Sequence, residues 1–221
     1  MNDLYDNELL KVLLKIIYLI DYMDNYTLQH SENVTKYVLL MGKELKMDDE
    51  DLKILEIGAM LHDIGKIGVP DYILIKNSNL TKEEYESIKK HVIIGEAILP
   101  SSGYEKIKSM IRSHHERLDG RGYPDGLKNG NIPYFARILS IADTFDAMTT
   151  QRTYNKPKTL DEAFSELLRV SEKRVYNDTV FQQLDPYLVK VFIQCIKNDF
   201  EIMEKFKNRN LSINDKVKTK K

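Results

Sequence analysis

The sequence has only one cysteine, Cys195, among 221 residues. A single cysteine excludes a disulfide within the chain and fits a reducing compartment, so we expect a cytoplasmic location. The formal net charge is −1, which provides no basic footprint for DNA or RNA. The N-terminus reads "MNDLYDNELL", which is acidic and is followed by no small-residue cleavage site, so we predict no signal peptide.

The sequence also lacks an apolar run that could span a bilayer. Its most hydrophobic stretch, "LLKVLLKIIYLI" at 9–20, reaches about half the length of a spanning helix, and Lys11 and Lys15 interrupt it. We expect this helix to pack on its own domain or to form a seam with a partner or a second copy in a homodimer. A helix lying on a membrane surface is the less favoured alternative.

Helical periodicity dominates what is present, because apolar residues recur at three- and four-residue steps. We predict an all-α fold without strands. Two helix starts carry caps: Thr81 with Glu84 forms a capping-box pattern, and Asp185 precedes Pro186. The predicted helices are Leu9–Met23, Ser31–Leu45, Asp49–Ile64, Thr81–Leu99, Tyr104–His114, Pro133–Met148, Leu160–Val170 and Pro186–Phe206.

One segment, "HHERLDGRGYPDGLKNGNIP" at 114–133, breaks this periodicity. It contains four of the ten glycines of the chain, two prolines and many charges. A segment of this length without periodic structure inside a domain is usually functional or disordered. Because it begins with two adjacent histidines, we favour a functional loop.

Histidines are few, and each has carboxylates within reach in the sequence. A single histidine on a helix is more often structural than a metal ligand, but all five together with buried carboxylates favour a metal site. A carboxylate such as Asp143, inside a strongly apolar helix, is costly to bury unless it is paired or coordinated. Imidazoles and carboxylates without thiolates indicate Fe, Mn or Zn, and their number exceeds one tetrahedral site. The candidate ligands are His30, His62, Asp63, His91, His114, His115 and Asp143.

Five motifs in order resemble the HD-GYP branch of the HD-domain phosphohydrolase superfamily. They are "YTLQHSENV", "LHDIGK", "IKKHVIIGEAIL", "HHERLDGRGYP" and "ADTFDAMTTQRTY", and they include every histidine of the chain. The resemblance spans roughly 22–154. It implies a helical bundle with a central metal centre and a phosphodiesterase of bacterial signalling that hydrolyses cyclic di-GMP to linear pGpG. Further cleavage to GMP stays open.

The resemblance also assigns the metal ligands. His30, His62, Asp63 and Asp143 would surround one divalent ion. Asp63, His91, His114 and His115 would surround a second, with Asp63 bridging the two. Iron or manganese is favoured, because zinc prefers fewer ligands. Hydrolysis would use a hydroxide activated by the two ions.

Three further residues are implied in binding the substrate. Lys66 follows Asp63 by three and would stabilise charge on the scissile phosphate, which makes Asp63 and Lys66 the implied catalytic pair. Tyr123 of the "GYP" tripeptide would contact the nucleotide, and Arg152 would grip a phosphate. The alternatives are a surface lysine at position 66 and a tyrosine at position 123 that only packs the loop.

The glycines and the remaining polar residues of these motifs have simpler interpretations. Gly120 and Gly122 would allow a positive φ or a close approach to a ligand. Arg137 and Asp146 are interpreted as structural residues or as supports of the metal cluster.

The chain departs from the family pattern in three places. Some members bind a third metal through a glutamate four residues before the first histidine; Tyr26 occupies that position, so we predict two metals. Asn155 stands where many relatives have a second basic residue, which changes phosphate binding. The segment 171–184 lacks the glycine turn of relatives, and we have no functional account of it from sequence.

The expected organisation is an N-terminal helix at 1–24, an HD-GYP domain at 25–207 and a basic disordered tail at 208–221. Two rival functions stay open. The first is hydrolysis of another cyclic dinucleotide, such as a mixed GMP–AMP messenger, or of a nucleotide. The second is a non-catalytic sensor that binds the messenger or a protein partner, which the complete ligand set disfavours.

Overall fold

The computed structural model describes residues 8–24, 27–76, 78–150 and 156–206. Helices account for most of these residues, which confirms the all-α prediction. A further helical stretch covers 200–206. The elements are α1 (Glu8–Asp24), α2 (Thr27–Glu44), α3 (Asp49–Leu61), the 3-10 helix η1 (Ile64–Gly68), α4 (Asp71–Leu74), α5 (Lys82–Lys89), α6 (His91–Ile98), α7 (Glu105–Ser113), the 3-10 helix η2 (Asn129–Asn131), α8 (Tyr134–Thr149), α9 (Leu160–Ser171), β1 (Arg174–Tyr176), β2 (Thr179–Phe181) and α10 (Pro186–Asn198).

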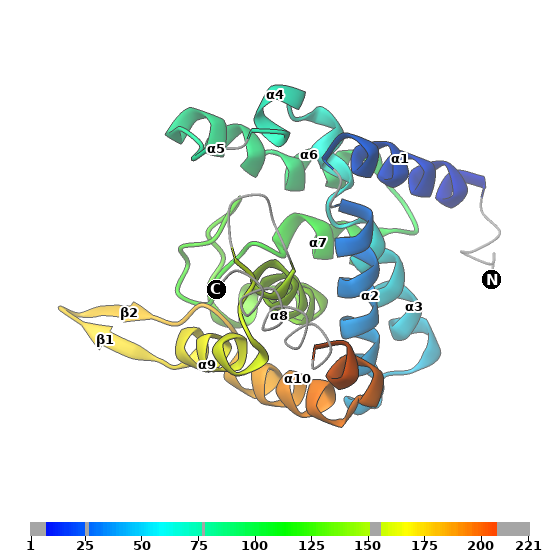
Figure 1. Cartoon of the computed structure of the whole chain (residues 1–221). Coiled ribbons are helices and arrows are strands. Elements are labelled where there is room, and N and C mark those ends of the chain that lie inside the picture. The colour runs from blue at the N-terminus through cyan, green and yellow to red at the C-terminus, as the bar shows by residue number, and fades with distance from the viewer. Residues whose placement is uncertain (1–7, 25–26, 77, 151–155, 207–221) are drawn as a thin grey trace, which may run out of the picture.

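Helix α8 occupies the centre of the fold, with the other elements around it. In Figure 1, α2 and α3 lie on one side of α8, and α9 and α10 lie below it. Above it, α1 and α4–α6 form a top layer, while β1 and β2 project at the left. In the same view, α7 lies between α8 and this top layer.

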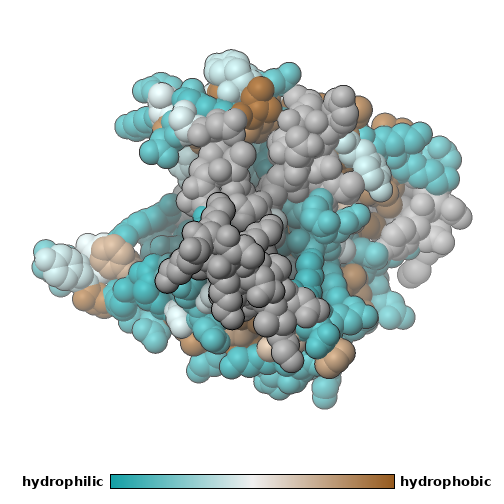
Figure 2. All heavy atoms as spheres, viewed as in Figure 1, coloured by the Kyte–Doolittle hydropathy of each residue, from teal (hydrophilic) through white to brown (hydrophobic). Residues whose placement is uncertain are grey.

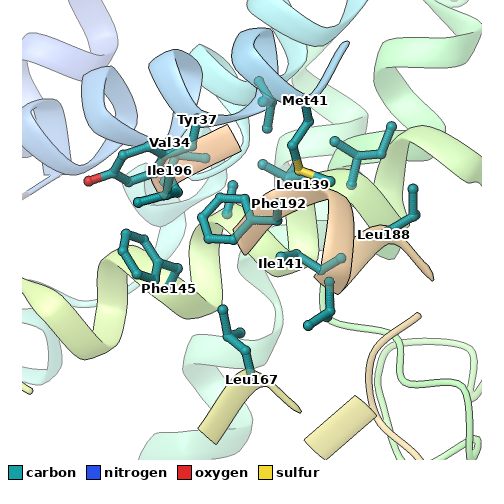
Figure 3. Close-up of a cluster of buried hydrophobic side chains, with 14 of the residues drawn as sticks. Val34, Tyr37, Met41, Leu139, Ile141, Phe145, Leu167, Leu188, Phe192 and Ile196 are labelled. Atoms are coloured by element: carbon teal, nitrogen blue, oxygen red, sulfur yellow. The ribbon is translucent and has the colours of Figure 1, made fainter. Parts of the chain in front are cut away.

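The main core is built by α2, α8, α9 and α10. Three aromatic rings meet at its middle: Phe145 lies 5.3 Å from Tyr37 and 5.0 Å from Phe192 between ring centroids, both in edge-to-face geometry. Figure 3 shows these rings with the aliphatic side chains around them. Aromatic pairs in this arrangement add to the stabilisation from burial.

A second core joins α1 to α3, η1 and α7. Leu10, Leu13, Ile17 and Ile20 of α1 are buried in it, so this helix packs on the domain. Leu19, on the opposite side of α1, is 60% exposed. Within the described residues, no helix combines the length and the apolar character needed to cross a membrane.

The prediction that the chain has no strand is wrong. Strands β1 and β2 form an antiparallel hairpin in which Val175 faces Val180. The two turn residues, Asn177 and Asp178, both have positive φ, of 46° and 57°, which suits a tight hairpin turn. Each strand has only three residues, and this is too short to show an alternating pattern in the sequence.

Three predicted helices are shorter than expected or divided, and a histidine explains two of the breaks. The third, Pro186–Phe206, is interrupted at Asp199, between α10 and the stretch 200–206. The predicted helix Asp49–Ile64 stops at Leu61, and the predicted helix Thr81–Leu99 divides into α5 and α6 just before His91. His62 and His91 place Nδ1 2.7 Å from the carbonyl oxygen three residues earlier. The imidazole thereby satisfies a carbonyl that the end of a helix leaves free.

The two predicted caps are confirmed. The hydroxyl of Thr81 accepts a hydrogen bond from the backbone N–H of Glu84, whose carboxylate accepts one from the N–H of Thr81. At the start of α10, the carboxylate of Asp185 accepts from the N–H groups of Tyr187 and Leu188. These bonds satisfy N–H groups that have no partner within a first helical turn.

Candidate metal centre

The predicted ligands come from five separate parts of the fold and meet at one place. His30 lies on α2, His62 and Asp63 lie between α3 and η1, and His91 opens α6. His114 and His115 follow α7, and Asp143 lies on α8. Two groups have ligand atoms close enough to share an ion: His30 with His62 and Asp63, and His91 with His114 and His115.

The carboxylate of Asp63 lies between these two groups. Its Oδ2 is 3.5 Å from Nε2 of His62 and 3.9 Å from Nε2 of His30. Its Oδ1 is 3.4 Å from Nε2 of His91, in the other group. One oxygen therefore faces each group, as a bridging carboxylate requires.

Three histidines are oriented by the backbone of the helix that precedes them. Nδ1 of His62, His91 and His114 lies 2.7 Å from the carbonyl oxygens of Ala59, Ile88 and Ile111, respectively. Because a carbonyl only accepts, each Nδ1 carries the proton and each Nε2 keeps its lone pair. The helix ends thus fix the tautomer that a metal ligand needs.

Two of these lone pairs are buried without a hydrogen-bond donor. Among the residues that the structure describes, Nε2 of His91 and Nε2 of His114 have no hydrogen-bond partner, and both atoms are fully buried. The nearest charged group to Nε2 of His91 is the Asp63 carboxylate, which is itself an acceptor. Buried acceptors that face one another are costly, and a shared cation removes that cost. The donor set therefore fits divalent metal ions.

His30 is held from behind by a buried carboxylate. Its Nδ1 lies 2.7 Å from Oδ2 of Asp146, and the side-chain amide of Asn33 donates to Oδ1 of Asp146 at 2.9 Å. On the other side of the ring, Nε2 lies 3.2 Å from Oδ1 of Asp143. Asp146 thus supports the cluster, as interpreted from sequence, whereas the role of Asn33 was missed. Its spacing of three from His30 on one helix face was the available signal.

Burial keeps four histidines of the cluster neutral. It lowers the pKa of His62 and of His91, lowers the pKa of His114 to about 3, and holds the pKa of His115 well below its ordinary value. Removing a positive imidazolium from water is unfavourable, so the uncharged form is preferred. Neutral imidazole is the form that binds metals.

The carboxylates and His30 behave in the opposite way. Burial alone would raise the pKa of Asp63, but the charge of Lys66 and the nearby histidines hold it well below its usual range. A hydrogen bond with His30 outweighs burial in the same way and lowers the pKa of Asp143. Burial would lower the pKa of His30, yet Asp143 and Asp146 raise it to about 9. The cluster therefore presents two ionised carboxylates.

A cleft of about 740 Å³ opens onto the cluster and contains two of the predicted substrate residues. Lys66 lies on its wall, with Nζ 2.8 Å from Oδ2 of Asp63. Tyr123 lines it as well, and its ring stacks on His115 at 4.7 Å between centroids. The third predicted residue, Arg152, lies outside the described residues, and so do Tyr26 and Asn155.

The segment 114–133 is organised by the carboxylate of Glu116, which follows the candidate ligand His115 in the sequence. Its oxygens accept hydrogen bonds from the backbone N–H groups of Asp125, Gly126 and Leu127 at 2.7 to 3.0 Å. Glu116 is 2% exposed. Both of its oxygens are used in holding the loop, so Glu116 is a positioning residue and does not face the metal groups.

The two glycines of "DGRGYP" serve different purposes. Gly120 has φ of +78°, as expected for a tight turn. At Gly122, a Cβ would lie 2.3 Å from Cα of Glu116, so the chain itself approaches closely there. The expectation of a close approach is met by the protein's own backbone.

The segment 171–184, for which sequence offered no account, braces the loop. The N–H of Leu118 donates to the carbonyl of Gln183, and the N–H of Gln182 lies 3.3 Å from Oδ2 of Asp119. The guanidinium of Arg121 lies 3.9 Å from the ring centroid of Phe181 on β2. The hairpin and its exit thus support the wall of the cleft that carries Tyr123.

Of the two interpretations of Arg137, the structure favours a structural residue over a support of the metal cluster. Its Nη1 lies 2.9 Å from Oδ2 of Asp185, the residue that caps α10. The contact joins α8 to α10 on a side of α8 that does not line the cleft. Arg137 therefore supports the packing of two helices.

A comparison of the chain with models of protein families agrees with this arrangement of histidines and carboxylates. A family model described as HD domain matches residues 16–180. The chain belongs to the HD domain family. This membership confirms the resemblance carried by the five motifs, and it covers the residues from α1 to the hairpin.

Similar HD-domain proteins fall into two groups by name. The chain is 37% identical, over 95% of its length, to a protein of Thermotoga maritima named "Cyclic di-GMP phosphodiesterase". It is also 37% identical, over 66% of its length, to a protein of Vibrio cholerae named "3'3'-cGAMP-specific phosphodiesterase 3". The crystal structure of a cyclic GMP-AMP specific phosphodiesterase of V. cholerae matches 93% of the chain and 52% of its own chain, with a TM-score of 0.62 and 19% identity, and shows the same fold.

The chain spans about half the length, or less, of these curated relatives. It covers 55% of the T. maritima protein and 32% of the V. cholerae protein.

Proposed function

We propose that this chain is a metal-dependent phosphodiesterase that hydrolyses cyclic di-GMP to linear pGpG. The observation that carries the proposal is Asp63, whose two oxygens face two separate groups of histidines at the bottom of an open cleft. Relatives with 37% identity and the name of such an enzyme support the same chemistry.

The proposed ligands follow the two groups. One ion would be held by His30, His62, Asp63 and Asp143, and a second by Asp63, His91, His114 and His115. Five imidazoles and two carboxylates favour iron or manganese, and this set is larger than zinc prefers. Two divalent ions in such a site supply Lewis acidity toward a phosphate and lower the pKa of water.

The protein's own groups orient and balance the charge of the scissile phosphate. Lys66 places one positive charge beside Asp63 at the cleft surface, where it would face a phosphate oxygen. Burial of the candidate ligands strengthens these interactions. The protein supplies Lys66 to stabilise charge that develops at phosphorus, and solvent at the cleft mouth would protonate the leaving sugar oxygen.

Tyr123 has a more restricted role than stacking on a nucleobase with a fully open ring. One face of its ring is covered by His115, and burial raises the pKa of its hydroxyl far above the ordinary value. We propose that Tyr123 holds the His115 ring in place and meets the substrate with its edge and hydroxyl. Arg152 is proposed as a phosphate ligand on the strength of the motif alone.

A second candidate substrate is 3′3′-cGAMP. V. cholerae relatives named as specific for this molecule match the chain with 37%, 34% and 33% identity. Both molecules carry two phosphodiester bonds between two ribonucleosides, so the metal centre alone does not select between them. A cytoplasmic location, consistent with the free Cys195, belongs to the same proposal.

The first experiment loads the purified protein with Mn²⁺ or Fe²⁺ and incubates it with cyclic di-GMP or 3′3′-cGAMP. Products are separated by chromatography, with Asp63→Ala as the inactive control. We expect pGpG from the wild type only. Cleavage of 3′3′-cGAMP alone would replace the first candidate by the second. Binding of either molecule without cleavage, at two metals per chain, would identify a sensor.

A further inference from the structure

The cleft continues beyond the metal centre to helix α5. The residues that line it run from His30 and Asp63 at the cluster to Tyr85 and Lys89 at the far wall. Its volume of about 740 Å³ lies within the range of ~300–1,000 Å³ for clefts that hold drug-sized ligands. In Figure 1, α5 lies at the outer edge of the top layer, and in Figure 2 the visible surface between this layer and the hairpin is mostly hydrophilic. A phosphodiester bound at the metals would leave room for the rest of its molecule there.

Most cations in this cleft are already engaged within the protein. Lys66 pairs with Asp63. Arg117 donates to the hydroxyl of Ser140 and to two backbone carbonyls, and Arg121 is held against the hairpin. These contacts hold Nζ of Lys66, Nη1 of Arg117 and Nη2 of Arg121 against groups of the protein itself.

Lys89 differs from these cations. Its ion pair is with Glu86, three residues earlier on α5, and the carboxylate side chain of Glu86 is 53% exposed. The side chain of Lys89 is itself only 27% exposed, but water and salt screen the exposed carboxylate and weaken the pair. An anion in the cleft can therefore compete for the ammonium group of Lys89 at low cost.

The position of Lys89 connects it to the metal centre through aromatic rings. Nζ lies 5.4 Å from the ring centroid of Tyr123, and the Tyr123 ring stacks on the candidate ligand His115. Nζ also lies 5.0 Å from the ring centroid of Tyr85. The ammonium group of Lys89 is thus near the rings of both Tyr85 and Tyr123.

Tyr85 is the more open of these two aromatic rings. It is 47% exposed and lines the cleft, whereas Tyr123 is covered by His115 on one side. Tyr85 and Lys89 are four residues apart, so they share one face of α5. An exposed ring beside an available cation is the combination that binds a nucleobase and its phosphate.

We propose that Tyr85 and Lys89 form a subsite for the half of the cyclic dinucleotide that is not cleaved. Lys89 pairs with the second phosphate, and Tyr85 stacks on a nucleobase. The inference rests on the proposed function, since it assumes a substrate with two phosphates. It assigns to α5 a specificity role, because substrates without a second phosphate and a second base gain nothing from this wall.

The test compares cyclic di-GMP and 3′3′-cGAMP with bis(p-nitrophenyl) phosphate, a phosphodiester that needs only the metal centre. The variants are Tyr85→Ala and Lys89→Met in the full chain. Matched controls are Tyr72→Ala, an exposed tyrosine on α4, and Lys90→Met, the exposed neighbour of Lys89. Kinetic constants for the three substrates and calorimetric Kd values for the two dinucleotides are measured.

We expect KM and Kd for the cleaved dinucleotide to rise roughly tenfold in each α5 variant, within the range for one lost stacking or ionic contact. The kcat for that substrate and the rate on bis(p-nitrophenyl) phosphate should stay within about twofold, as in both controls. Lys89→Met should also weaken the rise of KM with salt, because one ionic contact is lost.

Two results would overturn the inference. Unchanged KM and Kd in both variants would show that α5 does not touch the substrate. An equal loss of rate on bis(p-nitrophenyl) phosphate would show that these residues only shape the metal centre. If the wild type cleaves neither dinucleotide, the proposed function fails, and the Kd values alone test the subsite. A tenfold rise of Kd in the variants supports the subsite. An unchanged Kd, or no binding by the wild type, refutes it.

Discussion

The two walls of the cleft hold their shape by different means. On the metal side, each of three histidines follows a helix. Its Nδ1–H donates a hydrogen bond to a carbonyl in the last turn of that preceding helix. On the opposite side, the loop 116–133 has almost no regular structure, and the carboxylate of Glu116 satisfies three of its N–H groups.

This difference shows what makes a side chain available for chemistry. Helices satisfy most of their own backbone groups, so ligand atoms at a helix end stay free to face the centre. A loop without helices or strands needs a buried side chain as the partner of its N–H groups. Glu116 is adjacent to His115 in sequence, yet it is used entirely in this way. The following predictions separate the two walls, from the largest expected effect to the smallest.

Asp63→Asn should damage the metal wall most. The amide cannot carry the negative charge that both histidine groups face, so we expect more than a 100-fold loss of phosphodiesterase activity, exceeding the ~10–100-fold typical of outer ligands. Metal content, measured by atomic emission spectrometry, should fall below one ion per chain. Full activity with two bound ions would show that Asp63 does not bridge.

Removing the metal should destabilise the whole domain. A ligand at about 100 times its Kd stabilises the native state by about 3 kcal/mol, and for a chain of this size each kcal/mol shifts Tm by roughly 2–4 °C. Calorimetry with and without a chelator measures the shift. Asp63→Asn serves as the control and should show little difference between the two conditions.

Asp146→Asn should weaken the metal side of the cleft indirectly, through the contact of Asp146 with His30. The amide no longer provides a charge for Nδ1 of His30, and changes of this kind cost ~10–100-fold in metal affinity or activity. Competition with a chromogenic chelator measures the affinity. Wild-type affinity in this variant would mean that Asp143 alone orients His30.

Glu116→Gln should disturb the loop side of the cleft, which is the part of the segment 114–133 that Glu116 holds. It should leave the side with the metal-binding histidines intact. One oxygen of the carboxylate is replaced by a donor that faces N–H groups, and the loss is about 2 kcal/mol. We expect a Tm lower by several degrees, two metals still bound, and a raised KM for the cyclic dinucleotide. Glu32→Gln, at an exposed position on α2, should leave all three quantities unchanged.

Asp125→Asn should have the smallest effect. Its carboxylate receives two hydrogen bonds from Arg112 at the surface, an exposed pair worth at most about 1 kcal/mol. Those bonds lower the pKa of Asp125, so the pair stabilises the fold above the ordinary pKa and is lost as the pH falls through the folded-state pKa. The Tm difference between wild type and variant should therefore shrink below about pH 4. A constant difference would show that charge is not involved.

Much of the fold and of the candidate site could be predicted from the sequence. The apolar periodicity located most of the helices, and the capping residues Thr81 and Asp185 marked two starts correctly. The motifs named the histidines and carboxylates that the fold brings together. The hairpin at 174–181 was missed because its strands are shorter than any readable pattern.

Local chemistry decided the ligand types, while long-range contacts decided which groups are free to act. The order of histidines and aspartates along the chain already indicated imidazole and carboxylate as the candidate ligands. The sequence could not show that Asp146 supports His30 from 116 residues away, or that Glu116 turns toward its own loop. Those outcomes depend on which backbone groups remain unsatisfied once the helices have packed, and only the tertiary structure determines that.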